Sequence, residues 1–396
     1  MFGTLVVFMK QIVIAGLVFL VVFAYGVDSV HAASAYHSTH VRTVDTSLFT
    51  PPSPDASGVE YLPIAGHILI SDAEVEEMPL FAGANLFEIA TDGTLAGTGS
   101  TVLYSNEPTG LGYNPATNHL FVSDDVVRKI FEVDHGTDGR FGTADDQVVR
   151  SVNTTLFGNS DPEGVTFHTG DGALYIAGGI SSAIYRLLPG ANGIFDGIAP
   201  AGDDQVSSFS TSVHGVTDPE GIAANTDTGT LYIVGKPATV VIEVTTAGTL
   251  LTTIDISEAH AKKPAGLAYA PSSINPSTMN LYIVERGVDN NSDPNENDGK
   301  LYEMTLPPLL LSPTPTLTPV LSPTPALSIT VSPTPPVQHC TPLGDIDCSG
   351  NVNLFDLSTL LLNMNKADAP TSDLDNSGQV NLPDLMILLS HYGQSR

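Results

Sequence analysis

One pattern of oxygen-bearing side chains occurs twice near the C-terminus, and its spacing is suited to calcium binding. In each copy, oxygen side chains occupy loop positions 1, 3, 5, 9 and 12 with glycine at position 6, and the copies start 28 residues apart. Ca²⁺ takes several oxygen ligands at about 2.3–2.6 Å, and glycine permits the sharp turn that folds them around one point. The candidate calcium ligands are Asp345, Asp347, Ser349, Asn351, Asn353 and Asp356 in the first loop, and Asp373, Asp375, Ser377, Gln379, Asn381 and Asp384 in the second.

The segments around the two loops indicate what kind of module they form. An apolar run follows each loop, Leu357–Met364 and Leu385–Leu389, and predicts a helix that closes the site. No helix is expected before the first loop, because Pro342 and a Pro-rich segment lie there. With Asp at position 12 of both copies, the segment resembles the dockerin module of cellulosomes. The resemblance implies a small α-helical, EF-hand-like module over residues 339–396, two bound Ca²⁺ ions, and attachment to a cohesin-type or other extracellular protein.

The residues that follow the ligands differ from the dockerin pattern. Dockerins typically contact cohesin through small hydroxyl residues at loop positions 10 and 11, whereas this chain has Leu354-Phe355 and Leu382-Pro383 there. The resemblance therefore extends to calcium binding, and the choice between cohesin and another extracellular partner is left open.

The N-terminus predicts export. Residues 1–32 contain one basic residue, Lys10, then the apolar run Ile12–Tyr25 and small residues before a cleavage point after Ala32, as in a secretory signal peptide. An uncleaved membrane anchor is the alternative. With cleavage, we expect a secreted or cell-surface protein that has no membrane span.

Charge and cysteine content agree with export. The net charge of −29 argues against nucleic-acid binding, which needs a basic surface. The two cysteines, Cys340 and Cys348, favour a disulfide in an oxidising compartment, with two free thiols as the alternative.

A Pro/Thr/Ser-rich linker is expected over residues 307–338. Ser-Pro-Thr-Pro occurs there three times, beginning at Ser312, Ser322 and Ser332. Such a segment cannot build a core, favours extended polyproline II structure and is suited to O-glycosylation. It separates a large domain over residues 33–306 from the C-terminal module.

Five repeated units make up the large domain. Each has a Gly-apolar start, a short turn, a strand of alternating aliphatic and aromatic residues and a third strand, and the first four units add a fourth strand. This pattern predicts a mainly β fold, a single β-propeller with five blades, or six as the alternative. The repeat glycines, at intervals of 52, 54, 57 and 45 residues, are Gly58, Gly110, Gly164, Gly221 and Gly266.

The N-terminal segment is expected to close the ring of blades. Val41–Phe49 closely matches Val149–Phe157, which reads as a fourth strand with its exit, so it should complete the fifth blade. The Pro-Glu-Gly stretches that begin at Pro162 and Pro219 resemble propellers of the NHL, gluconolactonase-like and esterase-like phytase groups. This resemblance supports the propeller fold.

Propeller topology places several carboxylates on one face. They would hold a divalent cation, or supply acid and base groups for hydrolysis with Glu163 and Glu220 as the candidate catalytic residues. The simpler alternative is that Asp-Pro-Glu-Gly only forms turns. The carboxylates expected on this face are Asp161, Glu163, Asp218 and Glu220 from the loops into the innermost strands, and Asp72, Asp124, Asp125 and Glu285 from the ends of the second strands.

Two acidic loops are expected on the opposite face. Residues 134–146 and 192–204 join the third and fourth strands of the second and third units, and both alternate Asp or Asn with Gly. Such loops can wrap a Ca²⁺ ion and would give a further site in the propeller; solvated acidic turns are the alternative.

The function is left open between three hypotheses. The leading one is a secreted modular protein whose calcium-loaded, dockerin-like tail attaches a propeller that binds a polysaccharide or small-molecule ligand. The first alternative is an extracellular hydrolase in polysaccharide catabolism, the usual context of dockerins, and the second is a metal-dependent lactonase or phytase-like esterase. No Gly-x-Ser-x-Gly, His-Glu-x-x-His or phosphate-binding Gly motif occurs, so whether the propeller is an enzyme is undecided.

Overall fold

The chain forms two compact units, Met1–Leu310 and Leu311–Arg396. The computed structural model describes residues 34–288, 292–307, 340–364, 366, 371–375, 377 and 379–394. The expected signal peptide, and the expected linker apart from Pro307, lie outside these residues. Within the described part of the chain, no helix is both long and apolar enough to cross a membrane.

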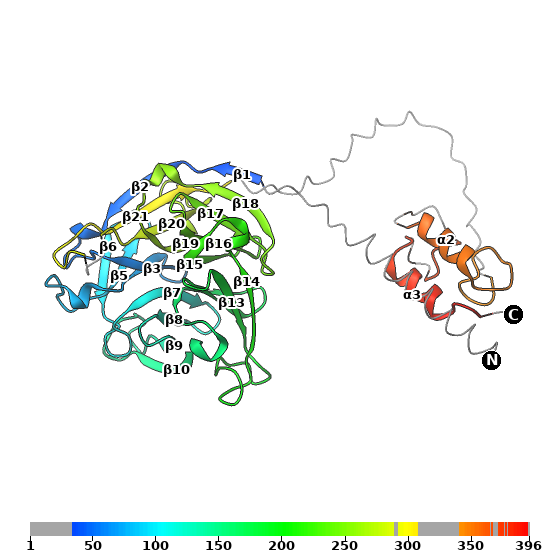
Figure 1. Cartoon of the computed structure of the whole chain (residues 1–396), viewed down its shortest axis with the longest axis horizontal. Helices are drawn as coiled ribbons and strands as arrows, with labels where there is room; N and C mark the ends of the chain where they lie inside the picture. Colours follow the sequence, from blue (N-terminus) through cyan, green and yellow to red (C-terminus); the bar gives the residue numbers. More distant parts are fainter. Residues whose placement is uncertain are drawn as a thin grey trace, which may run out of the picture. The chain divides into compact units, whose positions relative to one another are not determined.

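The first unit is a five-bladed β-propeller, which confirms the predicted fold and blade count (Figure 1). Each blade is a sheet of four antiparallel strands that runs outward from the axis. The blades are, in order, β3 (Ala56–Leu62), β4 (His67–Asp72), β5 (Leu86–Ala90) and β6 (Leu95–Gly99); β7 (Pro108–Asn114), β8 (His119–Asp124), β9 (Lys129–Asp134) and β10 (Gln147–Asn153); β11 (Pro162–His168), β12 (Ala173–Gly178), β13 (Ala183–Leu188) and β14 (Gln205–Ser210); β15 (Thr217–Asn225), β16 (Thr230–Lys236), β17 (Val240–Val244) and β18 (Leu250–Asp255); and β19 (Pro264–Pro271), β20 (Met279–Glu285), β21 (Lys300–Thr305) and β2 (His40–Asp45). Single 3-10 turns occur at Thr46–Leu48, Val75–Glu77, Thr154–Phe157, Ser212–His214 and Ser257–Ala259.

The burial of the residues in a blade depends on how far their strand lies from the propeller axis. The second strand of the third blade, β12, is buried at every position, because neighbouring blades cover both of its faces. The fourth strand, β14, has only intermediate and exposed residues, since it forms the outer edge. The core therefore consists of apolar layers between adjacent blades, in which fully buried Tyr175 and Ile176 face opposite sides. Each such side chain stabilises the fold by about 1.5–3 kcal/mol.

The N-terminal segment closes the ring, as the sequence predicts. β2 pairs antiparallel with β21, so that Val44 lies opposite Leu301, and Figure 1 shows the blue β2 beside the yellow β21. An additional strand, β1 (Ser34–His37), pairs in parallel with β18 on the outside of the fourth blade. The start of the chain's described part thus joins the fourth and fifth blades.

The five repeat glycines lie around the propeller axis, where the innermost strands touch. A Cβ atom at Gly110 would lie 2.6 Å from the Cα of Gly164, and a Cβ at Gly164 would lie 3.0 Å from the Cα of Gly221. The same holds around the ring, since a Cβ at Gly266 would lie 2.3 Å from the carbonyl oxygen of Ser57. Glycine is required here because any side chain would collide with the neighbouring backbone. The five glycines therefore let the innermost strands approach closely and narrow the space along the propeller axis. The acidic loops lie at one end of this axis.

The second unit is a small helical module with the two expected helices. α2 (Leu354–Leu362) and α3 (Leu382–Ser390) each begin at position 10 of a candidate calcium loop, so that the last candidate ligands, Asp356 and Asp384, lie in their first turns. Val352, Leu360, Val380 and Leu388 are fully buried and form its core. Cys340 and Cys348 form a disulfide, which confirms the prediction made from export and excludes the alternative of free thiols.

Candidate functional site

One face of the propeller gathers carboxylates around a single buried guanidinium. Nη2 of Arg286, the residue after β20, lies 3.1 Å from Oε2 of Glu163 in the third blade and 3.8 Å from Oε2 of Glu220 in the fourth. Burial by itself lowers the pKa of Arg286, but Glu163 and Glu220 reverse this effect and leave the pKa above its usual value. Arg286 therefore stays charged and links three blades.

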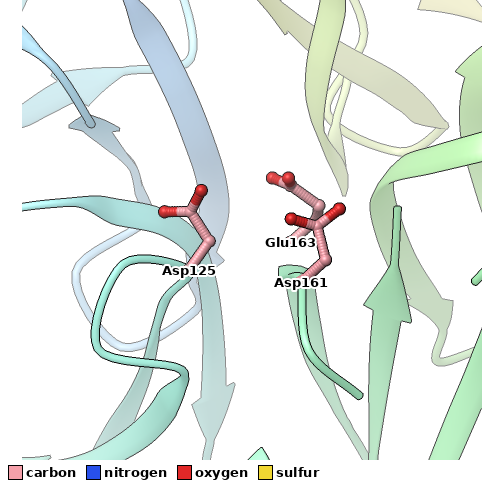
Figure 2. A group of neighbouring side chains, drawn as sticks. All are labelled: Asp125, Asp161 and Glu163. Carbon is pink, nitrogen blue, oxygen red and sulfur yellow. The ribbon is translucent and has the colours of Figure 1, made fainter. Parts of the chain in front are cut away.

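Three carboxylates next to Arg286 lie within reach of one ion. Asp125, Asp161 and Glu163 each offer a carboxylate oxygen, and these atoms all lie within 4.8 Å of one another. Figure 2 shows the carboxylate of Asp125, which follows β8, opposite those of Asp161 and Glu163 at the start of β11. Burial raises the pKa of Glu163 well above its ordinary value and raises that of Asp125, in both cases against the influence of Arg286. The attraction of the single Arg286 guanidinium is thus too weak to offset the effect of burial on the pKa values of the carboxylates around it.

The Asp-Pro-Glu-Gly loops position these side chains. Oδ2 of Asp161 accepts a hydrogen bond from the backbone N–H of Ile180, 2.8 Å away, which orients the carboxylate over the end of the blade. Gly179 permits this approach, because a Cβ there would lie 2.6 Å from Oδ2 of Asp161 and 3.0 Å from Oδ1 of Asp218. The alternative that Asp-Pro-Glu-Gly only forms turns does not hold, because Pro162–Gly164 belong to β11 and Asp218–Gly221 to β15.

A second set of acidic side chains lies on the loops of the fifth, first and second blades. In the first blade, both carboxylate oxygens of Asp55 and of Glu76 are buried and have no hydrogen-bond partner. Burial raises the pKa of Asp55 to about 9, with Asp72 adding to the shift. Burial likewise raises the pKa values of Glu76, Glu107 and Glu296 to about 8. Leaving a buried polar atom unpaired costs about 1–3 kcal/mol, so these oxygens are suited to a ligand that supplies positive charge.

Three predicted site residues have a structural role instead of lining the mouth. Oδ2 of Asp72 accepts hydrogen bonds from Oγ of Ser53 at 2.7 Å and from the N–H of Asp55 at 2.9 Å. Asp124 does the same in the second blade, where Ser105 donates to its Oδ2 at 2.7 Å.

Glu285 is the third of these residues, and it accepts hydrogen bonds from the Tyr302 hydroxyl at 2.9 Å and the N–H of Lys262 at 2.5 Å. The expectation that Asp72, Asp124 and Glu285 line the mouth is wrong, because each is at most 2% exposed and bonded to its own blade. Asp218 forms an ion pair with Lys236 nearer the surface.

The repeats contain a signal for the residues that were missed. Asp55, Glu107, Asp161 and Asp218 all lie three residues before a ring glycine, and Lys263 is their counterpart in the fifth blade. Asp125 and Arg286 also correspond to each other, since each directly follows the residue that pairs with the first residue of the innermost strand. Aligning the repeats position by position would have identified Asp55, Glu107 and Arg286. Glu76 and Glu296 have no such signal, because they lie in loops without counterparts.

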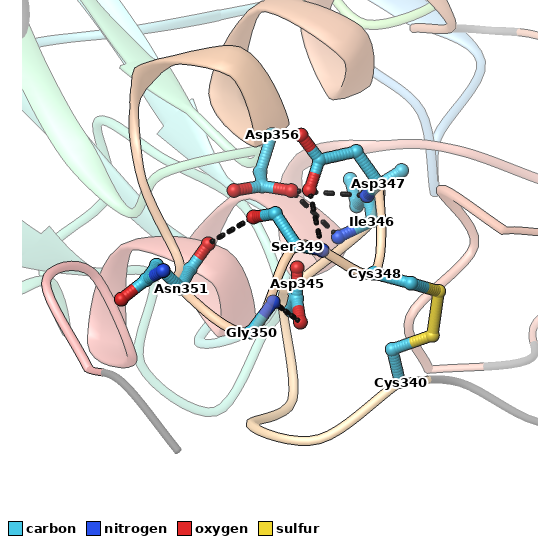
Figure 3. The surroundings of a disulfide bond; sticks show 9 residues. All are labelled: Cys340, Asp345, Ile346, Asp347, Cys348, Ser349, Gly350, Asn351 and Asp356. Atoms are coloured by element: carbon cyan, nitrogen blue, oxygen red, sulfur yellow. Dashed lines mark hydrogen bonds between the residues drawn. A yellow bond between two sulfur atoms is a disulfide. The ribbon is translucent and has the colours of Figure 1, made fainter.

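The two C-terminal loops bring together the carboxylates that the spacing predicts. Asp345, Asp347 and Asp356 form one group and Asp373, Asp375 and Asp384 another, and within each group the ligand atoms lie within 4.8 Å of one another. Asp356 closes its loop by accepting a hydrogen bond from the N–H group of Ile346 at 2.8 Å (Figure 3). It accepts a second one from the N–H group of Asn353, also at 2.8 Å. Asp384 does the same in the second loop with the N–H groups of Leu374 at 2.6 Å and Asn381 at 2.8 Å.

Other candidate ligands in these loops differ in how they contribute. Oδ1 of Asp345 is buried without a hydrogen-bond partner, although Oδ2 accepts from the N–H of Gly350 at 2.8 Å. The side chains of Asn351 and Gln379 are exposed, and their backbone oxygens face into the loops, where Asn353 and Asn381 donate to them at 3.1 and 3.0 Å. Ser349 and Ser377 also donate to these two oxygens. The loop geometry thus offers a backbone oxygen at position 7, as in an EF-hand.

Comparison with known proteins assigns neither a family nor an activity to this chain. No protein-family model matches the sequence, and no characterised protein matches it in sequence. Among solved structures, virginiamycin B lyase from Staphylococcus aureus is 17% identical, with 65% of this chain and 68% of that chain covered and a TM-score of 0.35. Regucalcin from Agrobacterium tumefaciens is 13% identical, with 69% and 97% covered and a TM-score of 0.38. Aldose sugar dehydrogenase from Streptomyces coelicolor is 13% identical, with 68% and 97% covered and a TM-score of 0.41. At such low similarity, the class of this chain is defined by its own five blades and acidic face.

Proposed function

We propose that this is an extracellular modular protein in which a calcium-loaded C-terminal module attaches a ligand-binding propeller to a partner protein. The observation that carries the proposal is the duplicated carboxylate group, Asp345, Asp347 and Asp356 in one loop and Asp373, Asp375 and Asp384 in the other. Like charges held this close in two equivalent loops repel one another, and a bound Ca²⁺ offsets that repulsion. The calcium ions therefore fold the module.

The surface of the module supports attachment through apolar contacts. On α2, Leu354 is 49% and Phe355 75% exposed, and on α3 Met386 is 65% exposed. These side chains lie on the helices that follow from the candidate calcium loops, in the region where a dockerin carries its recognition residues. An aromatic side chain exposed to this extent is a candidate binding residue because its burial in a partner contributes much of the affinity.

The test measures binding of the full chain to immobilised cohesin domains by surface plasmon resonance, in calcium and in excess chelator. We expect binding in calcium that is lost in chelator, in the Asp356→Asn/Asp384→Asn double variant, and in Phe355→Ser. Absence of calcium-dependent binding to a panel of cohesin domains would reject a cohesin partner. A helical circular dichroism signal that is unchanged in chelator would reject the calcium-loaded module itself.

A second candidate function is metal-dependent hydrolysis of an ester or lactone at the acidic face of the propeller. One carboxylate oxygen each of Asp125, Asp161 and Glu163 lies within 4.8 Å of the other two. This spacing is suited to shared coordination of one divalent cation. A divalent cation bound there would polarise a carbonyl oxygen and activate water.

The enzymatic candidate has its own test. Turnover of lactones, phosphate esters and glycans is measured for the full chain with calcium or magnesium, and for Glu163→Gln and Glu220→Gln. Turnover of an ester or lactone that needs the metal and is lost in Glu163→Gln supports this candidate. Turnover of glycans alone would favour the polysaccharide hydrolase, and absence of turnover on all three classes would leave ligand binding as the role of the propeller.

A further inference from the structure

Two loops of the propeller, one in the second blade and one in the third, have similar sequences and connect the same pair of strands in their blades. The loop between β9 and β10 contains Gly136-Thr-Asp-Gly-Arg-Phe-Gly142 and ends in Asp145-Asp146-Gln147. The loop between β13 and β14 contains Gly190-Ala-Asn-Gly-Ile-Phe-Asp-Gly197 and ends in Asp203-Asp204-Gln205. Because both connect a third strand to a fourth, they lie on the face opposite the Arg286 cluster.

The two loops also have the same internal hydrogen bonds. Oδ2 of the first terminal aspartate accepts from the N–H of Thr137 at 2.7 Å in the second blade and of Ala191 at 2.9 Å in the third. Oδ2 of the second aspartate accepts from the N–H of Gly142 at 2.8 Å and of Gly197 at 2.7 Å, respectively. The loops are therefore two versions of one structure, and any difference between them is informative.

The second-blade loop satisfies its aspartates with threonine hydroxyls. Oγ1 of Thr137 donates to Oδ2 of Asp145, and Oγ1 of Thr143 donates to Oδ1 of the same residue, both at 2.8 Å. Oδ1 of Asp146 accepts from the N–H and Oγ1 of Thr143, both at 3.4 Å. The hydrogen bonds from Thr137 and Thr143 lower the pKa of Asp145 to about 2, so the ionised carboxylate is stabilised by donors within the loop.

The third-blade loop lacks both hydroxyls, and it has a carboxylate, Asp196, directly after Phe195, where the second-blade loop has Gly142 after Phe141. Ala191 replaces Thr137, and the segment Ile198–Gly202 has no Ser or Thr to replace Thr143. Oδ1 of Asp204 is consequently buried without a hydrogen-bond partner in a residue that is only 7% exposed. Asp196 lies beside it, and the ligand atoms of Asp196, Asp203 and Asp204 are all within 4.8 Å of one another.

The loop holds its three carboxylates in place without a basic residue. Asn192 donates to Oδ2 of Asp196 at 2.7 Å, and the N–H of Asp203 donates to its Oδ1 at 3.1 Å. Two of the carboxylates lie in close contact with glycines. A Cβ atom at Gly190 would lie 2.3 Å from Oδ1 of Asp203, and a Cβ atom at Gly202 would lie 1.9 Å from Oδ1 of Asp196. No Lys or Arg occurs between Leu187 and Val206, so nothing in the loop neutralises the charge.

We propose that the loop from Gly190 to Asp204 binds a Ca²⁺ ion through Asp196, Asp203 and Asp204, and that the second-blade loop is the same structure stabilised by threonine in place of metal. The donors are all oxygen, and a carboxylate-rich oxygen site selects Ca²⁺ or Mg²⁺ over transition metals. A loop site with three carboxylates favours Ca²⁺, because Mg²⁺ demands near-ideal octahedral geometry and usually keeps several waters with one or two carboxylates. The residues of this site belong neither to the C-terminal module nor to the group of Arg286, Asp125, Asp161 and Glu163 on the other face of the propeller.

Hydrogen exchange with mass spectrometry on the full chain tests the proposal, since it reports each loop separately from the other calcium-binding parts. At a calcium concentration ten times the Kd, we expect exchange in the peptide over residues 190–204 to slow by roughly tenfold. The peptide over residues 136–147 is the internal control and should not change. Asp204→Asn, which keeps an oxygen for the N–H of Gly197, should abolish the protection, and Asp146→Asn at the matching position should leave it intact.

Asp196→Asn provides a second variant in case Asp204→Asn does not fold, because Asp196 is only partly buried. It should abolish the protection as well. Three results would overturn the proposal: no protection of residues 190–204 by calcium in the wild type, protection that persists in Asp196→Asn, or equal protection of both loops.

Discussion

Arg286 Nη2 lies 3.1 Å from Oε2 of Glu163, and this contact joins the fifth blade to the third across the acidic face of the propeller. The same guanidinium is 3.8 Å from Glu220 and interacts electrostatically with Asp55 and Asp125. This one positive group of the fifth blade thus interacts with acidic side chains from the other four blades, and replacing it should have a larger effect than replacing an ordinary surface cation.

We expect Arg286→Gln to lower the free energy of unfolding by about 3–5 kcal/mol at pH 7, because it leaves buried carboxylates without their partner. Urea unfolding followed by tyrosine fluorescence measures this change. The matched control is Lys236→Gln, which breaks the ion pair of Lys236 with Asp218 on the same face, where Lys236 is 70% exposed. An exposed pair contributes at most about 1 kcal/mol. Equal losses in the two variants would contradict the central role of Arg286.

The acidic face should make the metal-free propeller less stable as the pH rises. Burial holds the pKa of Asp55 at about 9 and those of Glu76 and Glu107 at about 8, whereas in the unfolded chain they are about 4. Between these values the folded state binds more protons than the unfolded state, so the free energy of unfolding falls from about pH 4 up to about pH 8–9.

Chemical unfolding in chelator at pH 5, 7 and 9 checks this slope. Asp55→Asn should flatten it, because an uncharged amide replaces a carboxyl group whose pKa burial raises to about 9. Asp145, whose pKa its threonine partners lower to about 2, has the opposite sign, and its contribution disappears only below about pH 4. A free energy of unfolding that rises from pH 5 to pH 9 in chelator would contradict the prediction.

Removal of calcium should unfold the C-terminal module and leave the propeller folded. α2 and α3 are the α-helices in the described part of the chain, so loss of the helical far-ultraviolet signal in excess chelator reports on the module. Asp356→Asn keeps oxygens for the N–H groups of Ile346 and Asn353 but removes a charge, and should weaken calcium binding about 10- to 100-fold. Calorimetric titration measures the affinity.

Phe355→Ser is the control for this experiment, because Phe355 is exposed and is not a candidate ligand. Its calcium affinity should match that of the wild type. A helical signal that is lost equally in Phe355→Ser without chelator would show that apolar packing, and not calcium, holds the module together.

The ring of blades should depend on β2. A chain that begins at Thr46 lacks the strand that pairs with β21 and should lose more than about 3 kcal/mol or aggregate, because a row of backbone groups, each contributing about 0.5–1.5 kcal/mol, becomes an open edge. A chain that begins at Thr39 lacks only β1 and should keep the propeller. Thermal unfolding and light scattering compare the two, and equal stability would show that the ring does not need β2.

Local chemistry was sufficient to predict the parts of this protein that repeat. Each blade carries its own glycine at the start of the innermost strand and its own alternating second strand, so five units and the closing match between Val41–Phe49 and Val149–Phe157 could be identified without a structure. The two candidate calcium loops were predicted in the same way, because their candidate ligands lie close together in the sequence and glycine permits the turn. The structure confirms the five blades and the closing strand, and brings three predicted carboxylates of each loop together.

Only the tertiary structure decided which acidic residues face one another across blades. Asp72 and Asp124 are the last residues of β4 and β8, and Asp125 directly follows β8. Hydrogen bonds from Ser53 and Ser105 nevertheless hold Asp72 and Asp124 buried in their own blades. Arg286 was missed because its partners, Glu163 and Glu220, lie 123 and 66 residues earlier in the chain and meet it only when the ring closes. The sequence alone determined the repeats and the local loops; burial and the distances between blades, which set the charge balance of the face, arise only when the five sheets pack around one axis.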